Sequence, residues 1–369
     1  MKKALIAFAL SLVCLLSGAQ RLAYDVSFDY IFLNAEFDRS NNVFEHSGTL
    51  HAARLTPLVG LDWNQGRRAS HSVRGGVDLF RNMGEKLPAG DVFGEVLLYY
   101  RADVPVRRTR GTFSAIAGIF PRSFSEGKYG DAFFSDDVLF VDNNFEGMFF
   151  KYSAPHIYAD LGLDWCGMKG LTRREAFRIM SAGKADLFGT DLFAFGWSAS
   201  MFHYAGSQTV RGVVDNTLVN PYLVADLASV VPMRQLSFKT GPLVGYQWDR
   251  VNDSQKHMPW GIESLLTAQL HDFGVENQFY WGDDLYYYDE AYGTDVYYGE
   301  PFYSWPWEGK SWMDKFAVFY EPRISESLSL NVSVEFYFGG RNEASPVLYR
   351  GTIQKLTLNV DLDHLFRNR

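Results

Sequence analysis

Near its end the chain alternates apolar and polar residues with a period of two. From Leu356 to Leu362 every second residue is apolar, and Thr357, Asn359 and Asp361 occupy the positions between them. Residues 327–338 repeat this pattern. Because successive side chains of a strand point to opposite faces, both segments predict strands with one apolar and one hydrophilic face.

The same alternation recurs along the chain and predicts sixteen strands in all. Their expected spans are 24–37, 47–63, 70–82, 92–104, 110–121, 144–153, 156–165, 173–184, 190–204, 218–231, 235–248, 258–271, 273–284, 313–324, 326–339 and 350–366. Such segments reach the roughly 9–11 residues that a tilted strand needs to cross a bilayer, whereas a soluble strand averages about 5–6. Connections after odd-numbered strands are long, and most connections after even-numbered strands are tight turns, as at Pro155, Pro232 and Asp272.

The alternating last strand with its terminal aromatic Phe366 resembles the closing strand of Gram-negative outer-membrane β-barrels, which also alternate short turns with long external loops. The resemblance implies an all-β fold, a transmembrane antiparallel up-and-down β-barrel of about 16 strands (14–18). A sheet in lipid must close, because an open edge leaves backbone groups unpaired. The expected location is the cell outer membrane, and the barrel assembly machinery would be a partner during biogenesis.

The first 19 residues have the pattern of a secretory signal peptide. Lys2 and Lys3 precede an apolar run, and Ser17, Gly18 and Ala19 form a small-residue cleavage site. Residues 20–369 show no break in composition and no linker, so we expect a single barrel domain. Cys166 is then the only cysteine left, which excludes an intrachain disulfide.

The net charge of −8 disfavours nucleic acid as a partner, since phosphate backbones require a basic surface. The expected partners are outer-membrane lipid and small hydrophilic solutes or glycans, and homo-oligomers are left open. The eight histidines show no metal-ligand spacing, and the chain has no glycine-rich phosphate loop. We therefore expect neither a metal nor another cofactor.

Charged residues fall on the hydrophilic faces of the predicted strands, where they are expected to line an aqueous pore. The basic ones are Arg54, Arg74, Arg101, Lys151, Arg174 and Arg178. The acidic ones are Glu263, Glu276, Glu321 and Glu335. A charge facing hydrocarbon costs about 2–4 kcal/mol at mid-membrane, so these side chains should face inward. Pairing across strands as structural ion pairs is the alternative to a role in permeation.

The loop at residues 122–143 follows the fifth strand and is acidic. It carries Asp131, Asp136, Asp137 and Asp142. This arrangement resembles that of sixteen-stranded general porins, whose third external loop folds inward and sets acidic residues opposite a basic wall. The resemblance implies a porin-like channel for diffusion of small hydrophilic solutes, with the four aspartates at its constriction. Alternatively, the loop caps the outside of the barrel.

The loop at residues 285–312 holds eleven aromatic residues in 28 positions, among them Tyr287, Tyr298, Tyr303, Trp305 and Trp307. Exposed rings stack on sugars or on a partner protein. The alternative function is therefore a surface-exposed binding protein for a glycan or a partner protein. Rings that only rigidify a long loop are the simpler interpretation.

A barrel lipase or deacylase would present histidine and serine together on one face of a strand. His46 and Ser47 are sequence neighbours and so face opposite ways, and His203 is four residues from Ser207. Neither pair has the His-x-Ser spacing. We therefore expect a channel without catalytic residues and not an enzyme.

Overall fold

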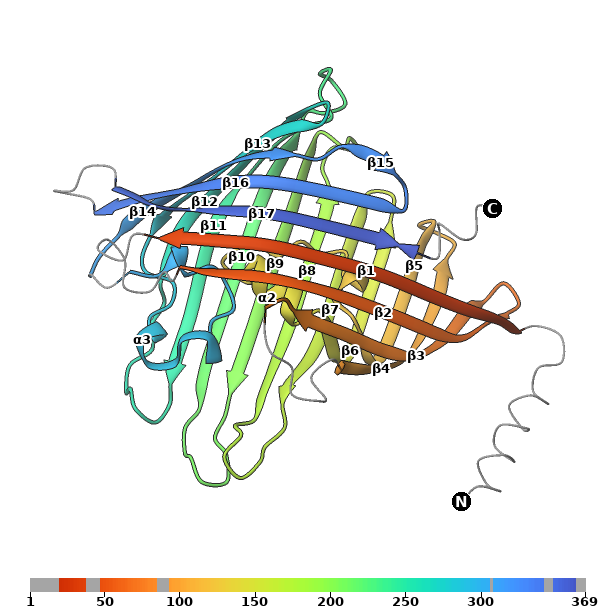
Figure 1. Ribbon diagram of the computed structural model, residues 1–369, viewed down its shortest axis with the longest axis horizontal. Coiled ribbons are helices and arrows are strands. Elements are labelled where there is room, and N and C mark those ends of the chain that lie inside the picture. Colours follow the sequence, from red (N-terminus) through yellow and green to blue (C-terminus); the bar gives the residue numbers. More distant parts are fainter. Residues whose placement is uncertain (1–19, 38–46, 85–92, 306–307, 342–347, 363–369) are drawn as a thin grey trace.

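The computed structural model describes residues 20–37, 47–84, 93–305, 308–341 and 348–362, and in them an antiparallel sheet closes on itself. The last strand, β17, pairs with the first, β1, from Ser27↔Asp361 to Phe37↔Gly351. Figure 1 shows these two strands side by side at the seam. The predicted closed, all-β antiparallel barrel of about 16 strands is confirmed. The expected signal peptide lies outside the described residues.

Within the described residues, sixteen long strands form the wall, and a short seventeenth, β15, pairs with the start of β16. The strands are β1 (Gln20–Phe37), β2 (Gly48–Gln65), β3 (Ala69–Asn82), β4 (Phe93–Val106), β5 (Gly111–Pro121), β6 (Asn144–Ala154), β7 (Ile157–Gly167), β8 (Ala176–Asp186), β9 (Phe193–Tyr204), β10 (Val214–Asp226), β11 (Gln235–Asp249), β12 (Trp260–Leu270), β13 (Phe273–Gly282), β14 (Ser311–Tyr320), β15 (Arg323–Ser325), β16 (Leu328–Arg341) and β17 (Leu348–Asp361). The helices are η1 (Arg122–Phe124), α2 (Asp136–Val141), α3 (Asp289–Tyr292), η2 (Gly293–Asp295) and η3 (Pro301–Tyr303). Among the described residues, none of the helices has the length and apolar character needed to span a membrane.

One predicted strand is misplaced along the chain. The expected strand at 218–231 is observed as β10, Val214–Asp226. The apolar residues of 227–231 extend the alternation in the sequence, but they form the turn before β11, where Val230 donates a backbone hydrogen bond to Leu227. Hydrophobic periodicity cannot separate a strand from an apolar turn, so only the pairing with β9 and β11 fixes the register.

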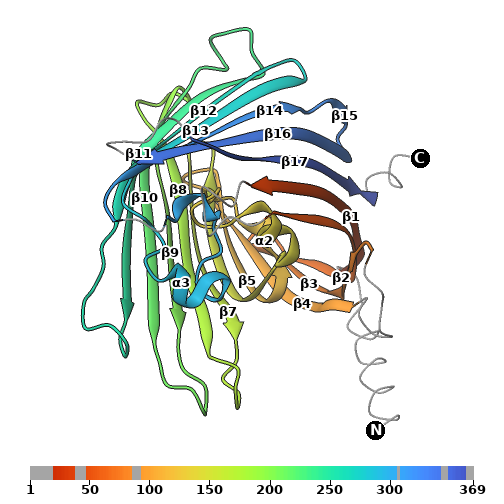
Figure 2. The same cartoon turned by 60° about the vertical axis from the view of Figure 1, so that its left-hand side comes forward.

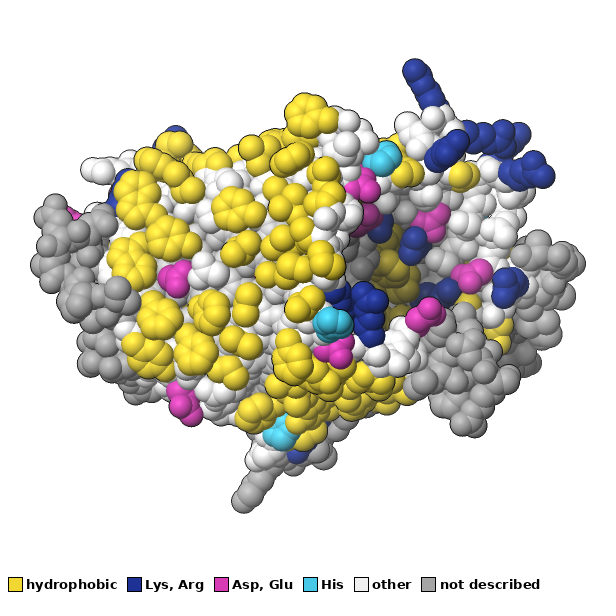
Figure 3. All heavy atoms as spheres, turned by 90° about the horizontal axis from the view of Figure 1, so that it is seen from above, with side chains coloured by type: hydrophobic (Ala, Val, Ile, Leu, Met, Phe, Trp, Pro, Cys, Tyr) yellow, Lys and Arg dark blue, Asp and Glu magenta, His cyan; other side chains and the backbone are white. Residues whose placement is uncertain are grey.

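The outer and inner faces of the wall differ as the alternation predicts. Outward residues such as Val96, Leu98 and Leu223 are 62%, 62% and 56% exposed, because they face the surroundings of the barrel. Figure 3 shows this broad hydrophobic surface beside a hollow at which Lys, Arg, Asp and Glu side chains gather. The charged residues lie inside because hydrocarbon cannot solvate them.

Two connections fold into the barrel and contact one another there. Loop 122–143 carries α2 into the lumen, and the β13–β14 connection carries α3 to its mouth (Figure 2). The backbone N–H of Ser135 donates to the carbonyl of Tyr298 at 2.7 Å, and the hydroxyl of Tyr286 donates to the carbonyl of Ala132 at 3.0 Å. These contacts join the two loops into one inner layer.

A cavity of about 960 Å³ remains between this inner layer and the wall. It is lined by residues of β1–β4, β16 and β17 together with Leu139 and Phe140 of α2. Many of the lining side chains are polar or charged, among them Arg74, Asn331 and Asn359. This part of the lumen is therefore an aqueous chamber.

The parity of β16 predicts opposite outcomes for two neighbouring arginine substitutions. Val332→Arg puts a charge on the lipid face, at a cost of about 2–4 kcal/mol near the bilayer midplane, and should block assembly. Asn331→Arg faces the polar chamber and should assemble like the wild type. The fraction of folded barrel in each variant is measured by its heat-modifiable mobility in gel electrophoresis. Equal losses from both substitutions would contradict the assigned faces.

The inner layer also predicts a pH-dependent stability. Burial, with the nearby charges of Asp289 and Asp283, raises the pKa of Asp284 from 3.8 to about 7. Between these values the folded protein holds a proton that the unfolded chain releases, so stability falls as the pH rises from 4 to 7. Asp284→Asn should therefore raise the melting temperature at pH 8, by roughly 2 °C or more, and leave it unchanged at pH 4.

Glu290→Gln removes an exposed carboxylate from the same loop and serves as the control for this melting experiment. It should leave the melting temperature unchanged at both pH values. A shift for Asp284→Asn that is equal at pH 4 and pH 8 would show that the side-chain amide, and not the titration, is responsible.

Candidate functional site

An aspartate of β10 orients a histidine of β9 on the outer wall of the barrel. Nδ1 of His203 lies 2.7 Å from Oδ1 of Asp215, and the two residues are direct partners in the sheet. A carboxylate can only accept, so in the neutral ring this hydrogen bond places the proton on Nδ1 and leaves Nε2 as an acceptor. A histidine held in this way by a carboxylate has the arrangement of a general base with its orienting group.

Arg250 holds the other carboxylate oxygen of this pair. Its Nε and Nη2 both lie 2.6 Å from Oδ2 of Asp215. The side chain of Asp215 is only 10% exposed, whereas that of Arg250 is 46% exposed. The arginine therefore fixes a nearly enclosed carboxylate in the position that His203 requires, while part of its guanidinium group reaches the surface.

His203 belongs to a row of rings across the outward face. Phe177 of β8 is its partner in the sheet, with ring centroids 4.9 Å apart, and Trp165 of β7 stacks on Phe177 at 5.6 Å. Phe193 and Phe195 share the face of His203 on β9 and are 46% and 42% exposed. This face is therefore turned towards the membrane.

The row lies at the extracellular end of the wall. His203 is the last residue but one of β9, and the connection that follows is one of the longer ones. Long connections of outer-membrane barrels lie outside the cell. The imidazole is thus placed at the level where the outer leaflet meets its headgroups.

The sequence did not indicate this group, because its members come from β9, from β10 and from the residue that follows β11. Ser207, which the sequence analysis considered beside His203 and set aside, accepts hydrogen bonds from the backbone N–H groups of Thr209 and Val210. Asp215 is 12 residues from His203, and only the register of β9 against β10 brings them together. His46, the other histidine considered, lies outside the described residues.

The predicted pore-lining basic residues lie inside, with one exception. Arg54 donates to Asp78 and to the carbonyl of Phe140 in α2. Arg74 pairs with Asp62 of the neighbouring strand β2 and with Asp25 of β1, one strand further along the sheet. The remaining inward residues are Arg101, Lys151 and Arg178, which contact Asp103, Glu126 and the ring of Tyr298, respectively. All five are engaged in structural contacts.

Arg174 is the exception among the basic residues. It lies in the connection between β7 and β8, where its guanidinium group sits 3.9 Å from the ring centroid of Tyr204. The expected strand at 173–184 begins only at Ala176, because residues before it form an extracellular loop. Arg174 therefore does not line the wall.

The predicted acidic residues also pair with neighbours. Inside the barrel, Glu263, Glu276 and Glu335 contact Lys239 at 3.8 Å, Lys315 at 3.8 Å and Lys355 at 2.8 Å, respectively. Glu321 instead follows the end of β14 and pairs with Arg234 at the opposite, periplasmic end. It lies outside the wall because β14 is shorter than the sequence predicts.

Loop 122–143 presents its aspartates to the lumen wall. Asp131 pairs with Lys315 and Asp136 with Lys355, while Asp142 pairs with Arg122 of its own loop at 2.6 Å. Asp137 lines a separate pocket of about 450 Å³ with Glu146 and Cys166. Ion pairs of this kind hold the loop in place. The structure shows these contacts and does not test the roles predicted for these and the other lumen residues, which stay predictions.

The aromatic loop is not an exposed binding surface. Tyr303 and Trp305 are 0% and 2% exposed, and Tyr298 packs over Arg178 inside the barrel. Tyr287 is 52% exposed, and Trp307 lies outside the described residues. The rings turn inward because they provide the apolar contacts of the inner layer, which the sequence pattern of a loop does not reveal.

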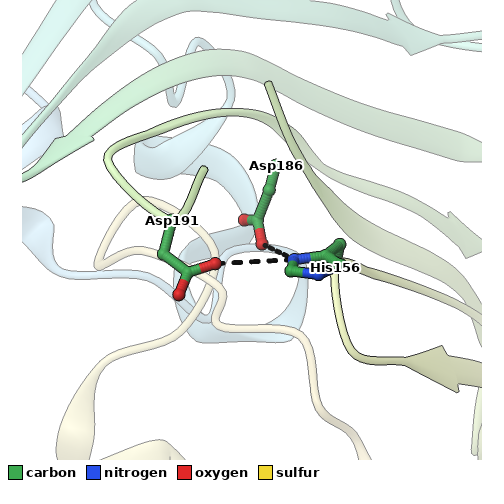
Figure 4. A group of neighbouring side chains, drawn as sticks. All are labelled: His156, Asp186 and Asp191. Carbon is green, nitrogen blue, oxygen red and sulfur yellow. Dashed lines mark hydrogen bonds and ion pairs between the residues drawn. The ribbon is translucent and has the colours of Figure 1, made fainter. Parts of the chain in front are cut away.

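A further group of side chains has metal-ligand spacing, but it lies at the periplasmic turns. Nδ1 of His156 is 3.2 Å from Asp186 and 3.5 Å from Asp191 (Figure 4). The ligand atoms lie within 4.8 Å of one another. His156 and Asp191 are 61% and 79% exposed, and Lys184 already lies 3.7 Å from Asp186. This group is at the opposite end of the barrel from His203 and takes no part in that site.

Solved structures with the same architecture are outer-membrane proteins. The loop L8 deletion mutant of OmpT from Vibrio cholerae aligns with a TM-score of 0.54 at 10% identity, covering 93% of this chain and 99% of that chain. The in-vitro folded, trimeric form of OmpT from Vibrio cholerae gives 0.54 at 9% identity, with 93% and 99% covered. Identities this low show the fold alone, and they confirm an outer-membrane barrel. Comparison with curated proteins gave no match.

A sequence model of the lipid A 3'-O-deacylase-type family matches residues 19–366. This family contains hydrolases that act on lipid A, so the match corrects three expectations from the sequence. The porin-like diffusion channel is wrong, the alternative of a surface binding protein is wrong, and so is the expectation that the chain is not an enzyme. Since the match covers nearly the whole chain, the protein belongs to the lipid A 3'-O-deacylase-type family.

Proposed function

We propose that this protein hydrolyses an acyl ester of lipid A, with His203 as the general base. The observation that supports this proposal is the hydrogen-bonded group of His203, Asp215 and Arg250, which lies on the outward face near the extracellular end of the barrel. Lipid A lies in the outer leaflet, so its ester bonds approach the barrel from the side and not through the lumen. A catalytic group on the outer wall meets such a substrate without removing it from the membrane.

The nucleophile in this proposal is water. In the described part of the chain, no serine or threonine hydroxyl hydrogen-bonds to His203. His203 therefore positions no side-chain oxygen that could be acylated to form an acyl-enzyme. Nε2 of His203 accepts a proton from a water molecule as the water oxygen attacks the ester carbonyl. Asp215 keeps the ring in the required tautomer and stabilises the imidazolium that forms.

The remaining steps return the enzyme to its starting state. The tetrahedral intermediate breaks the bond between the carbonyl carbon and the sugar oxygen. That oxygen takes the proton from Nε2–H of His203 as it leaves, which restores the neutral ring. The products are a free fatty acid and a sugar hydroxyl, so one water molecule is consumed for each ester cleaved.

The rings beside His203 suit the acyl part of such a substrate. Phe177 and Trp165 extend the outward row away from Asp215. An acyl chain that lies along these apolar side chains remains in a hydrocarbon environment. Its ester end then reaches the imidazole at the headgroup level.

Replacing either member of the hydrogen-bonded pair should strongly slow hydrolysis. His203→Ala and Asp215→Asn should each lower the rate by at least about 100-fold, the usual contribution of general base catalysis. Mass spectrometry of lipid A from cells that express each variant measures the loss of an acyl chain, and fragmentation shows which ester was cleaved.

His71→Ala is a matched control, since His71 also faces outward and stacks on Trp63 at 5.3 Å, but near the periplasmic end of β3. It should retain the wild-type rate. Full deacylation by a folded His203→Ala protein would place the reaction elsewhere and refute the assignment.

A further inference from the structure

The outward row of the candidate site continues past Asp215 to a lysine. Asp215 is the sheet partner of Trp248 in β11, and the bridge between Gln247 and His257 puts Lys256 beside Trp248 in the same way. His203 and Lys256 therefore lie in one row, three strand positions apart. At about 4.8 Å for each strand, this separation is roughly 14 Å.

Lys256 is held above outward-facing rings. Its Nζ lies 4.7 Å from the ring centroid of Trp248 and 5.9 Å from that of Tyr246. The indole N–H of Trp248 donates to the backbone carbonyl of Asp253 at 3.2 Å, which fixes the ring under the lysine. A stacked ammonium group of this kind keeps its position while its N–H donors stay available.

The carboxylate of Asp253, which lies in the same hairpin as Lys256, already has other hydrogen-bond partners. Asp253 accepts hydrogen bonds from Nε2 of His257 at 2.7 Å and from the hydroxyl of Tyr288 at 3.2 Å. Lys256 itself is exposed and, within the described ranges, forms no ion pair. The lysine thus presents a positive charge over the ring of Trp248, which Arg250 also contacts, near the extracellular end of the wall.

From this geometry we infer that Lys256 binds a phosphate group of the same glycolipid whose ester faces His203. The inference rests on the proposed function and adds to it a second contact point, at the sugar headgroup. Lipid A is a phosphorylated, acylated disaccharide, and a span of roughly 14 Å is of the order of such a headgroup. An exposed lysine at a membrane surface attracts anionic headgroups, and Trp248 supplies an apolar face for the sugar ring.

The two ends of the row then contact different parts of the substrate. The rings of Trp165 and Phe177 contact the acyl chain, and Lys256 contacts the phosphate. His203 lies between them, where the ester joins the acyl chain to the sugar. Lys256 acts in this arrangement as a specificity residue, because it binds the substrate without touching the ester.

Binding of two lipids to the full-length protein in detergent micelles tests this inference. Native mass spectrometry should show that Lys256→Gln binds diphosphorylated lipid A about fivefold more weakly than the wild type, the loss expected for one charge contact at a membrane surface. Chemically dephosphorylated lipid A should bind both proteins equally. Lys256→Arg keeps the charge and should restore the wild-type preference.

Lys169→Gln is the matched control, since Lys169 is an exposed lysine in the connection between β7 and β8. It should leave both affinities unchanged. Where the wild type deacylates lipid A, Lys256→Gln should raise KM and leave kcat unchanged, because the lysine contacts the ground state and the transition state alike. Equal affinity of Lys256→Gln and wild type for the diphosphorylated lipid would overturn the phosphate site.

The two proposals fail in different ways. A wild-type protein that cleaves no ester in either lipid overturns the proposed hydrolysis. The phosphate site is decided by binding alone, and it stands if the loss in Lys256→Gln is confined to the phosphorylated lipid. A loss of equal size for both lipids would instead show that Lys256 supports the hairpin, and it would refute phosphate recognition.

Discussion

Backbone hydrogen bonding in a hydrocarbon environment is the constraint on which this structure depends. Every peptide group in the wall must find a partner within the sheet, since lipid offers none. The pairing of β1 with β17 meets this requirement at the seam, where Phe28 lies opposite Val360 and Phe32 opposite Leu356. Once the sheet is closed it has an inside and an outside, and each strand must place its apolar residues on the lipid side.

Closure also determines what the lumen contains. The inward charges of the wall need partners, and several of these partners come from loop 122–143. Lys315 and Lys355 hold the aspartates of this loop, and the β13–β14 connection packs its rings against it. The result is an inner layer whose acidic loop resembles, in its sequence, the constriction loop of a channel. In the structure the same residues form ion pairs with the wall.

The outer wall has the opposite character. A polar group on this face is costly, so the hydrogen-bonded group of His203, Asp215 and Arg250 stands out among apolar neighbours. Its position at the end of β9 and β10 limits this cost, because the headgroup region solvates charge. The site that we propose faces outward, on the side from which a substrate in the outer leaflet approaches the barrel. A chain of this fold therefore does not need an open pore to act on its substrate.

The alternation of residues along the sequence determined the closed barrel and which side chains of each strand face lipid, because a period of two admits one arrangement once a bilayer surrounds the sheet. It placed Arg54 and Glu335 inside for the same reason. The alternation did not determine the strand ends, as the apolar turn after β10 shows.

Only the tertiary structure decided which side chains meet across strands. His203 and Asp215 are 12 residues apart, and Arg250 is a further 35 away, so their contact depends on a register that no single segment encodes. The aromatic loop turned inward for a similar reason: burial of its rings depends on a lumen that exists only after all the strands have closed around it.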